Sequence, residues 1–193
     1  MTESDVMVVS PHPDDAEYGV AGTVARWVKE GKRVIYVVCT NGDKGTSDIH
    51  MNPEQLIATR KKEQRAAADV LGVSEVIFLG LPDQGLEDTP EFRKRIVRLL
   101  RQYRPNTVVT ADPYRRYVWH RDHRITGQVV LDAVFPYARD HLAYLKFRPC
   151  AATRARCSNW RFPTLKAGCG SDAGMSPRMK NSSWARRFTG LRY

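Results

Sequence analysis

Short β-branched runs alternate with longer amphipathic segments along this chain, and the alternation limits the folds that it can adopt. The apolar runs that read as strands occupy residues 6–10, 33–40, 75–81 and 107–111. The segments with helical periodicity occupy residues 18–30, 53–71, 90–103 and 125–135. Strands that alternate with helices predict βαβ units around a parallel sheet. We therefore expect a single-domain α/β fold with a doubly wound, mostly parallel sheet.

The expected topology directs attention to one edge of the sheet. With right-handed crossovers and the strand order 3-2-1-4-5, the first and fourth strands are neighbours at the topological switch point. Ligands of doubly wound sheets bind just outside the carboxyl ends of such strands. The residues that follow these strands, 11–17 and 112–124, are therefore the candidates for a functional site.

The first of these stretches reads Pro-His-Pro-Asp-Asp-Ala-Glu and places polar side chains in a stiff turn, because its two prolines fix φ. A structural alternative is that Asp14 or Asp15 caps the following helix, with Glu17 favoured near its positive end. A single aspartate would be enough for capping. The second aspartate and His12 therefore favour a functional role.

The second stretch, residues 119–124, reads Trp-His-Arg-Asp-His-Arg. If it begins a helix, His120 and His123 lie on one face; taken alone, a charged and solvated helix start explains the pattern slightly better. The two stretches together indicate more, because the fold brings them to one edge. His12, Asp15 and His123 would then converge and hold a metal, with positions left for water and substrate. Such a set suggests Zn²⁺, and it can also hold Fe²⁺.

The neighbouring side chains predict hydrolysis of an amide at this metal. Consecutive residues of an extended chain point in different directions, so one of Asp14 and Asp15 can bind the metal while the other accepts a proton from water. A bound metal lowers the pKa of that water to about 7. His120 could stabilise an oxyanion or protonate the leaving amine, and Asp122 could orient an imidazole.

The two motifs together resemble those of the PIG-L or LmbE-like superfamily of N-acetylglucosaminyl deacetylases. Within it, the chain is most similar to the deacetylases of bacillithiol and mycothiol biosynthesis. The resemblance extends from residue 5 to about residue 145. It includes Thr40-Asn41-Gly42, the Arg60-x-x-Glu63 spacing, Leu-Gly-Val at residues 71–73, and Leu81-Pro82-Asp83.

This resemblance implies a Rossmann-like fold, a divalent metal that is usually Zn²⁺, and removal of an N-acetyl group from an amino-sugar conjugate. It also implies roles for individual residues: metal binding by His12, Asp15 and His123, general-base catalysis by Asp14, acid or electrophilic catalysis by His120 with Asp122 behind it, and sugar contact by Arg60 and Asp83. Without the resemblance, Arg60 would be interpreted as a surface residue in a basic run with Lys61 and Lys62.

The basic charge of the chain is concentrated near its C-terminal end. The net charge is +10, yet residues 1–145 hold 20 basic and 20 acidic residues, whereas residues 146–193 hold 11 basic residues and a single acid, Asp172. Three of the four cysteines also lie in this tail. We hypothesise that residues 146–193 are poorly ordered and are not the native family ending. A shifted reading frame or a truncated gene would produce such a tail. A genuine basic extension is the alternative.

Three other functions compete with a deacetylase. The same ligands would suit a non-haem iron enzyme, the basic tail could bind nucleic acid, and the metal site could persist in an inactive, truncated family member. Nucleic-acid binding is disfavoured, because the aromatic residues of the tail lack module spacing. Family members usually continue with further strands and a helix that carries another histidine, whereas no histidine follows His141.

Cysteine usage and the apolar runs bear on location and partners. The four cysteines show no C-x-x-C spacing and no secretory signal pattern is present, which predicts a reducing, cytoplasmic setting. The longest apolar runs are too short to cross a bilayer. We expect a small amino-sugar conjugate as the partner, and assembly into a homo-oligomer stays open.

Overall fold

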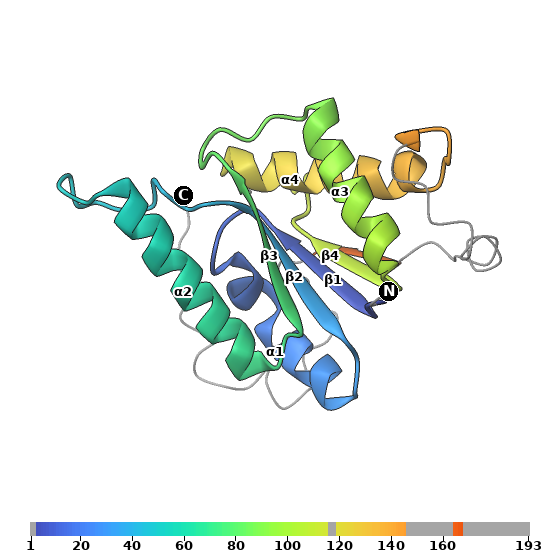
Figure 1. Ribbon diagram of the computed structural model, residues 1–193, viewed down its shortest axis with the longest axis horizontal. Coiled ribbons are helices and arrows are strands. Elements are labelled where there is room, and N and C mark those ends of the chain that lie inside the picture. The colour runs from blue at the N-terminus through green and yellow to red at the C-terminus, as the bar shows by residue number, and fades with distance from the viewer. Residues whose placement is uncertain (1–2, 116–118, 146–163, 168–193) are drawn as a thin grey trace, which may run out of the picture.

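Five parallel strands form one sheet with β1 at its centre. In a computed structural model of the chain, which describes residues 3–115, 119–145 and 164–167, the sheet has the order β3-β2-β1-β4-β5 (Figure 1). The strands are β1 (Val6–Ser10), β2 (Val34–Thr40), β3 (Glu75–Leu81), β4 (Thr107–Thr110) and β5 (Thr164–Ala167). Every neighbouring pair is parallel. The predicted α/β class, the doubly wound sheet and the strand order are confirmed.

Helices cover both faces of the sheet (Figure 1). On one face lie α1 (Asp15–Lys29) and α2 (Pro53–Leu71), and on the other lie α3 (Pro90–Tyr103) and α4 (Arg121–Asp132). The last of these continues into a π-helical segment, η1 (Ala133–Ala138). The connections from β1 to β2, from β2 to β3 and from β3 to β4 each place one helix on a face of the sheet, as the βαβ pattern predicts.

Side chains of the central strand alternate between two cores, as the two-residue period of a strand requires. Met7 packs with Leu100 and Val129 on the face covered by α3 and α4. Val8 packs with Trp27 on the opposite face, which α1 and α2 cover. Because both faces are buried, β1 is apolar from Val6 to Val9, and this is the pattern that made it predictable.

Local signals set the helix ends. Asn52 caps α2, and its side-chain oxygen accepts a hydrogen bond from the Glu54 N–H at 2.8 Å, while Gly72 ends that helix in the left-handed conformation at φ 73°. The predicted starts at residues 18 and 125 are late, because α1 begins at Asp15 and α4 begins at Arg121. The first turns of both helices are polar, so hydrophobic periodicity does not mark them.

β5 corrects part of the expectation for the tail, in which the sequence shows no strand pattern. Residues 164–167 pair in parallel with β4, from Thr107 opposite Thr164 to Thr110 opposite Ala167. An edge strand is held by backbone hydrogen bonds, which need no apolar pattern, so composition does not disclose it. Residues 146–163 and 168–193 lie outside the described residues, and the division at residue 145 with a poorly ordered tail stays a prediction for them.

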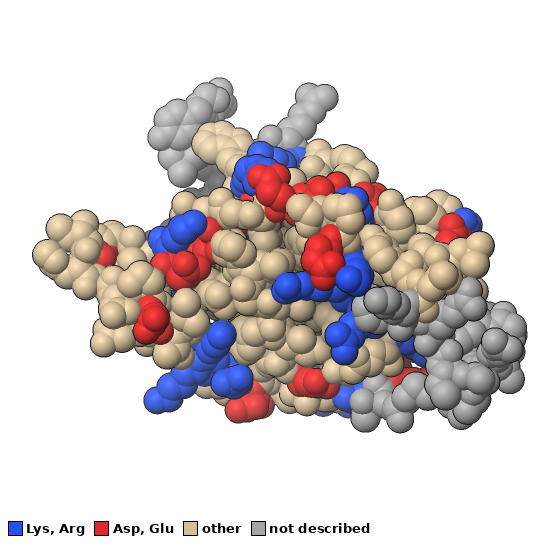
Figure 2. All heavy atoms as spheres, turned by 45° about the horizontal axis from the view of Figure 1, so that its top comes forward, with Lys and Arg blue, Asp and Glu red and all other residues tan. Residues whose placement is uncertain are grey.

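The surface of the described residues carries both signs of charge. On the face shown in Figure 2, Lys and Arg side chains lie beside Asp and Glu side chains. This mixture agrees with the equal numbers of basic and acidic residues over residues 1–145. Among the helices of the described part of the chain, none is both long enough and apolar enough to cross a membrane.

Candidate metal centre

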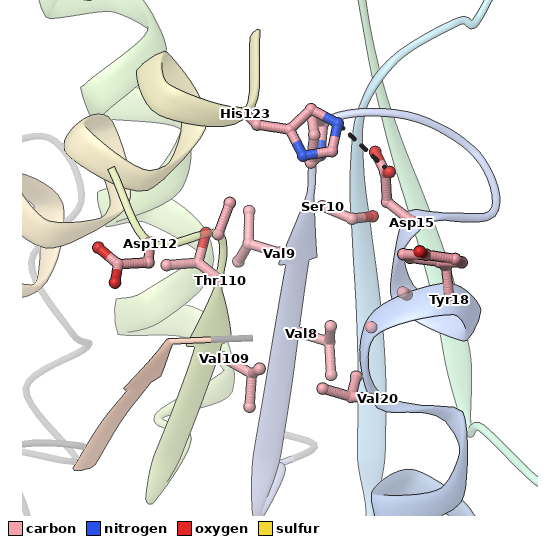
Figure 3. A pocket seen from close by; sticks show the side chains of 14 residues that line it. Val8, Val9, Ser10, Asp15, Tyr18, Val20, Val109, Thr110, Asp112 and His123 are labelled. Atoms are coloured by element: carbon pink, nitrogen blue, oxygen red, sulfur yellow. Dashed lines mark ion pairs between the residues drawn. The ribbon is translucent and has the colours of Figure 1, made fainter. Parts of the chain in front are cut away.

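The two polar stretches meet at the carboxyl ends of β1 and β4. Residues 11–14 lead from β1 into α1, and α4 begins directly after His120, its N-cap residue. In Figure 3, His123 and Asp15 lie together beyond the end of β1. The second stretch therefore does begin a helix, and the fold brings both stretches to the switch point as expected.

Asp15 lies between two of the histidines. Its Oδ2 is 3.0 Å from His12 Nδ1 and its Oδ1 is 3.3 Å from His123 Nε2, the contact drawn as a dashed line in Figure 3. The His12 and His123 ring centres are 5.3 Å apart. Burial lowers the pKa of His123, which favours the neutral imidazole that binds metals. The three residues predicted as metal ligands thus lie together.

The other nitrogen of His12 faces two carboxylates. His12 Nε2 lies 3.1 Å from Asp83 Oδ1 and 3.2 Å from Asp122 Oδ2. Burial alone would lower the pKa of His12, but hydrogen bonds and negative charges from Asp15, Asp122 and Asp83 outweigh it and raise the pKa. A carboxylate on the second nitrogen is the usual way to fix the orientation of a metal-binding imidazole.

Asp122 is fully buried at the base of α4 and is held by backbone groups. Its Oδ2 accepts a hydrogen bond from the Gln84 N–H at 2.7 Å, and its Oδ1 accepts one from the Leu86 N–H at 3.3 Å. Its carboxylate was expected behind His120. The structure places it against His12 instead, because the first turn of α4 directs the side chain inward, toward the loop that follows β3.

Asp83 also differs from its expected place. It is only 4% exposed, and its Oδ2 accepts a hydrogen bond from the Lys44 N–H at 3.0 Å while Oδ1 faces His12. The resemblance implied contact with a sugar. The burial of the carboxylate favours a role in supporting His12 over contact with a ligand from solvent.

His120 is the exposed imidazole of the group. Its ring centre is 4.6 Å from that of His12 and 5.3 Å from that of His123. Its Nδ1 accepts a hydrogen bond from the Asp122 N–H at 3.3 Å and so caps α4. His120 therefore borders the centre on the solvent side, where a substrate would approach.

Asp14 has a left-handed backbone, with φ 85° and ψ −23°, and directs its carboxylate away from Asp15. It occupies the N-cap position of α1 but makes no side-chain capping hydrogen bond, so the capping alternative is wrong for this residue. Its Oδ2 accepts a hydrogen bond from Arg60 Nη2 at 2.7 Å. Arg60 also donates to the Pro13 carbonyl oxygen at 2.9 Å, so it belongs to the site and is not a plain surface residue.

Sequence analysis missed Gln64, which is 2% exposed and links α2 to the first turn of α1. Its Oε1 accepts a hydrogen bond from the Asp14 N–H at 2.9 Å, and its Nε2 donates to Glu17 Oε1 at 2.8 Å. Along the sequence it is one of many polar residues in α2, and no local pattern distinguishes it.

Two sets of described side chains bring ligand atoms within 4.8 Å of one another: His12 with His120 and His123, and His12 with Asp83 and Asp122. The first set offers three imidazole nitrogens, and the Asp15 carboxylate lies beside two of these histidines, His12 and His123. The second set offers one imidazole nitrogen and two carboxylates. These donors suit Zn²⁺ and Fe²⁺ alike, so the residues fit a divalent cation. Both oxygens of Asp122 already accept backbone hydrogen bonds, which leaves the side of Asp15 and His123 better able to bind one.

A pocket opens beside this centre, between β1, β4 and α1 (Figure 3). Asp15 and His123 border its polar end, and Val8, Val20 and Val109 line its apolar part. A small molecule in the pocket would thus have an apolar wall on one side and the histidine–aspartate group on the other.

A doubly wound parallel sheet with histidines and carboxylates at its switch point defines an α/β protein with a candidate metal centre. The chain matches the model of the PIG-L family, described as GlcNAc-PI de-N-acetylase, over residues 7–134. The chain belongs to this family. The resemblance that the motifs indicated is thereby confirmed.

Individual relatives agree with this membership. The diacetylchitobiose deacetylase of Thermococcus kodakarensis is 36% identical over 129 residues, which cover 67% of this chain and 48% of the relative. The N,N'-diacetylchitobiose deacetylase of Pyrococcus horikoshii superposes with a TM-score of 0.72 at 34% identity, covering 74% of this chain and 53% of that structure. The chain therefore spans about half the length of these relatives.

One relative is similar over a larger part of this chain. The 1D-myo-inositol 2-acetamido-2-deoxy-alpha-D-glucopyranoside deacetylase of Mycobacteroides abscessus is 30% identical over an alignment that covers 88% of this chain and 68% of the relative. The 145 residues before the tail cannot supply that coverage alone. The alignment therefore extends into the tail.

Proposed function

We propose that this protein is a metal-dependent hydrolase that removes the N-acetyl group from an N-acetylglucosamine-type conjugate. The observation that carries the proposal is the divergence of two consecutive carboxylates: Asp15 contacts His12 and His123, while Asp14 points to Arg60. In our proposal, Asp15 completes the metal site and Asp14 accepts a proton. Membership of a deacetylase family supports the same reaction.

In this proposal, His12, Asp15 and His123 hold the cation, and Zn²⁺ is the ion that we expect, with Fe²⁺ as the alternative. When bound, the cation supplies Lewis acidity that makes water a nucleophile near neutral pH. Asp83 and Asp122 hold the imidazole of His12 in place from its other nitrogen.

The protein's own groups then move the protons of amide hydrolysis. The oxygen of water bonds to the acetyl carbonyl carbon, and its proton passes to Asp14. His120 lies on the exposed side, where it can stabilise the oxyanion and donate a proton to the leaving amine as the C–N bond breaks. Acetate and the free amino sugar are the products. Arg60 is 28% exposed, which leaves part of its guanidinium available to the sugar.

The proposal is tested by acetate release from a panel of N-acetylglucosamine conjugates, diacetylchitobiose among them. We expect release by the metal-loaded protein, loss of release with a chelator, and recovery on adding Zn²⁺. A parallel assay with Fe²⁺ under anaerobic conditions distinguishes the two metals. If a chelator left acetate release unchanged, the metal requirement would be refuted. If no conjugate released acetate, the proposed deacetylase activity would be refuted.

A further inference from the structure

The peptide unit between Pro13 and Asp14 is held at both ends by one face of α2. Its carbonyl oxygen accepts a hydrogen bond from Arg60 Nη2 at 2.9 Å, and its N–H donates to Gln64 Oε1 at 2.9 Å. Residues 60 and 64 are four apart in a helix and therefore lie on the same face. The orientation of this single peptide plane is thus set by α2, nearly 50 residues along the chain.

The orientation of this peptide decides where the Asp14 carboxylate points. Asp14 has φ 85°, in the left-handed region that residues other than glycine rarely occupy. Such a conformation persists where the surrounding structure imposes it. Asp14 makes no side-chain capping hydrogen bond, and the hydrogen bond that its carboxylate accepts comes from Arg60 on α2. If the peptide plane rotated, φ of Asp14 would change and its carboxylate would leave its present position beside Arg60.

Gln64 is suited to hold the plane because its amide can face only one way. The Asp14 N–H can only donate, so it requires the amide oxygen; Glu17 Oε1, 2.8 Å from Nε2, accepts from the amide nitrogen. The side chain is 2% exposed, so water cannot replace it without a rearrangement. Arg60 does not substitute for it, because a guanidinium has no acceptor for the Asp14 N–H.

We infer that Gln64 is a positioning residue for catalysis, which fixes the Asp14 carboxylate through the Asp14 N–H. This inference rests on the proposed function, in which Asp14 is the general base. It assigns to α2 a task beyond packing: residues 60 and 64 together set the geometry of proton transfer.

The test compares three variants. Gln64→Met removes both hydrogen bonds with little change in side-chain length. Gln64→Glu keeps an oxygen that accepts from the Asp14 N–H. Gln128→Met is the matched control, because the Gln128 amide donates within α4, to Asp132 Oδ1 at 3.1 Å, and does not contact Asp14. For each we measure metal content, hydrogen exchange of the Asp14 amide by NMR, and kcat and KM for acetate release.

We expect Gln64→Met to bind metal like the wild type, with Asp14 amide exchange at least about tenfold faster. Its kcat should fall by about 10- to 100-fold, because a small misplacement of a reacting group has effects of that size. Its KM should stay within about twofold, because substrate binding is not the step that is lost. Gln64→Glu should recover part of the kcat, and Gln128→Met should resemble the wild type.

Two results would overturn the inference: unchanged Asp14 exchange in Gln64→Met, or faster exchange with an unchanged kcat. If Gln64→Met does not fold, Gln64→Asn replaces it, because the asparagine amide is one methylene too short to reach Asp14. Equal kcat values for the asparagine and glutamate variants would then overturn the inference. A wild-type protein that releases no acetate, while Asp14 exchange still depends on Gln64, would instead refute the proposed function.

Discussion

At the scale of single residues, His123 is the proposed ligand that joins α4 to the loop after β1. We expect His123→Ala to lower metal content sharply, because two remaining ligands hold Zn²⁺ much less well than three. Metal analysis of the purified protein measures this. His50→Ala is the matched control, since His50 is an exposed histidine in a loop outside the centre. Full metal occupancy in His123→Ala would show that the ligand set is wrong.

Asp14 is expected to act on protons and not on the metal. Asn at this position is nearly isosteric with Asp and tolerates the left-handed backbone, but it cannot accept a proton. Asp14→Asn should therefore keep its metal and lose about 10²- to 10⁴-fold in kcat, the usual contribution of a general base. Steady-state kinetics with metal analysis tests this, with Asp48→Asn in an exposed loop as the control. A loss smaller than about tenfold would place the base elsewhere.

His120 caps α4, and in the proposed mechanism it also acts in catalysis; the two roles can be separated by substitution. His120→Ala removes both the N-cap of α4 and the imidazole, whereas His120→Asn restores a capping oxygen without the acid. We expect both variants to bind metal and to lose most of their activity, and only the alanine variant to lose about 1 kcal/mol of stability. Chemical denaturation and acetate release distinguish the two effects. Metal loss in His120→Asn would mean that His120, too, is a ligand.

Much of the site could be predicted from the sequence, because the strands determine where their following loops meet. His12, Asp15 and His123 could be placed together on topology alone. The partners of His12 Nε2 could not be predicted in this way. Asp83 lies in the loop after β3, two strands further along the chain than His12, and its side chain points inward to His12. Gln64 contacts Asp14 across 50 residues of sequence, and no local pattern reports a contact of that kind.

At the scale of elements, α4, which carries His123, packs closely on the chain after β4. Gly127 permits this approach: a Cβ there would lie 2.4 Å from the Ala111 carbonyl oxygen and 2.9 Å from Pro113 Cδ. We expect Gly127→Ala to cost about 1–3 kcal/mol of stability, as overpacking of a tight contact does. Urea denaturation measures it.

Gly22 supplies the comparison for Gly127 within another helix. It lies in the interior of α1, and a Cβ added there would meet nothing within 4 Å. Gly22→Ala should therefore stabilise the protein by up to about 1 kcal/mol, through helix propensity alone. Equal effects of the two substitutions would show that the contact between α4 and the chain after β4 does not determine the cost.

The central strands were predicted from their burial, whereas two helix starts and the edge strand were not. The central strands β1 and β2 were placed from their apolar runs, because both of their faces pack against helices. The helix starts were predicted late, since the polar turns that carry Asp15 and His123 belong to the site and interrupt the apolar pattern. β5, at the sheet edge, was missed for a different reason: its place depends on backbone pairing with β4.

At the scale of the whole molecule, the proposed cation would tie the two sides of the sheet together. Asp15 belongs to α1 on one face, His123 belongs to α4 on the other, and His12 lies in the loop between β1 and α1. A ligand that binds the folded state and not the unfolded chain stabilises the fold by mass action, by about 2.7 kcal/mol at 100 times its Kd.

We therefore expect the Tm of the protein to rise with Zn²⁺ concentration and to fall when a chelator removes the metal. Asp14→Asn should show the same shift as the wild type, because Asp14 is not among the proposed ligands, and His123→Ala should show little of it. Differential scanning calorimetry at several Zn²⁺ concentrations measures the shift. If His123→Ala gained as much stability from Zn²⁺ as the wild type, the cation would bind elsewhere, and the link between α1 and α4 would be refuted even if the deacetylase activity were present.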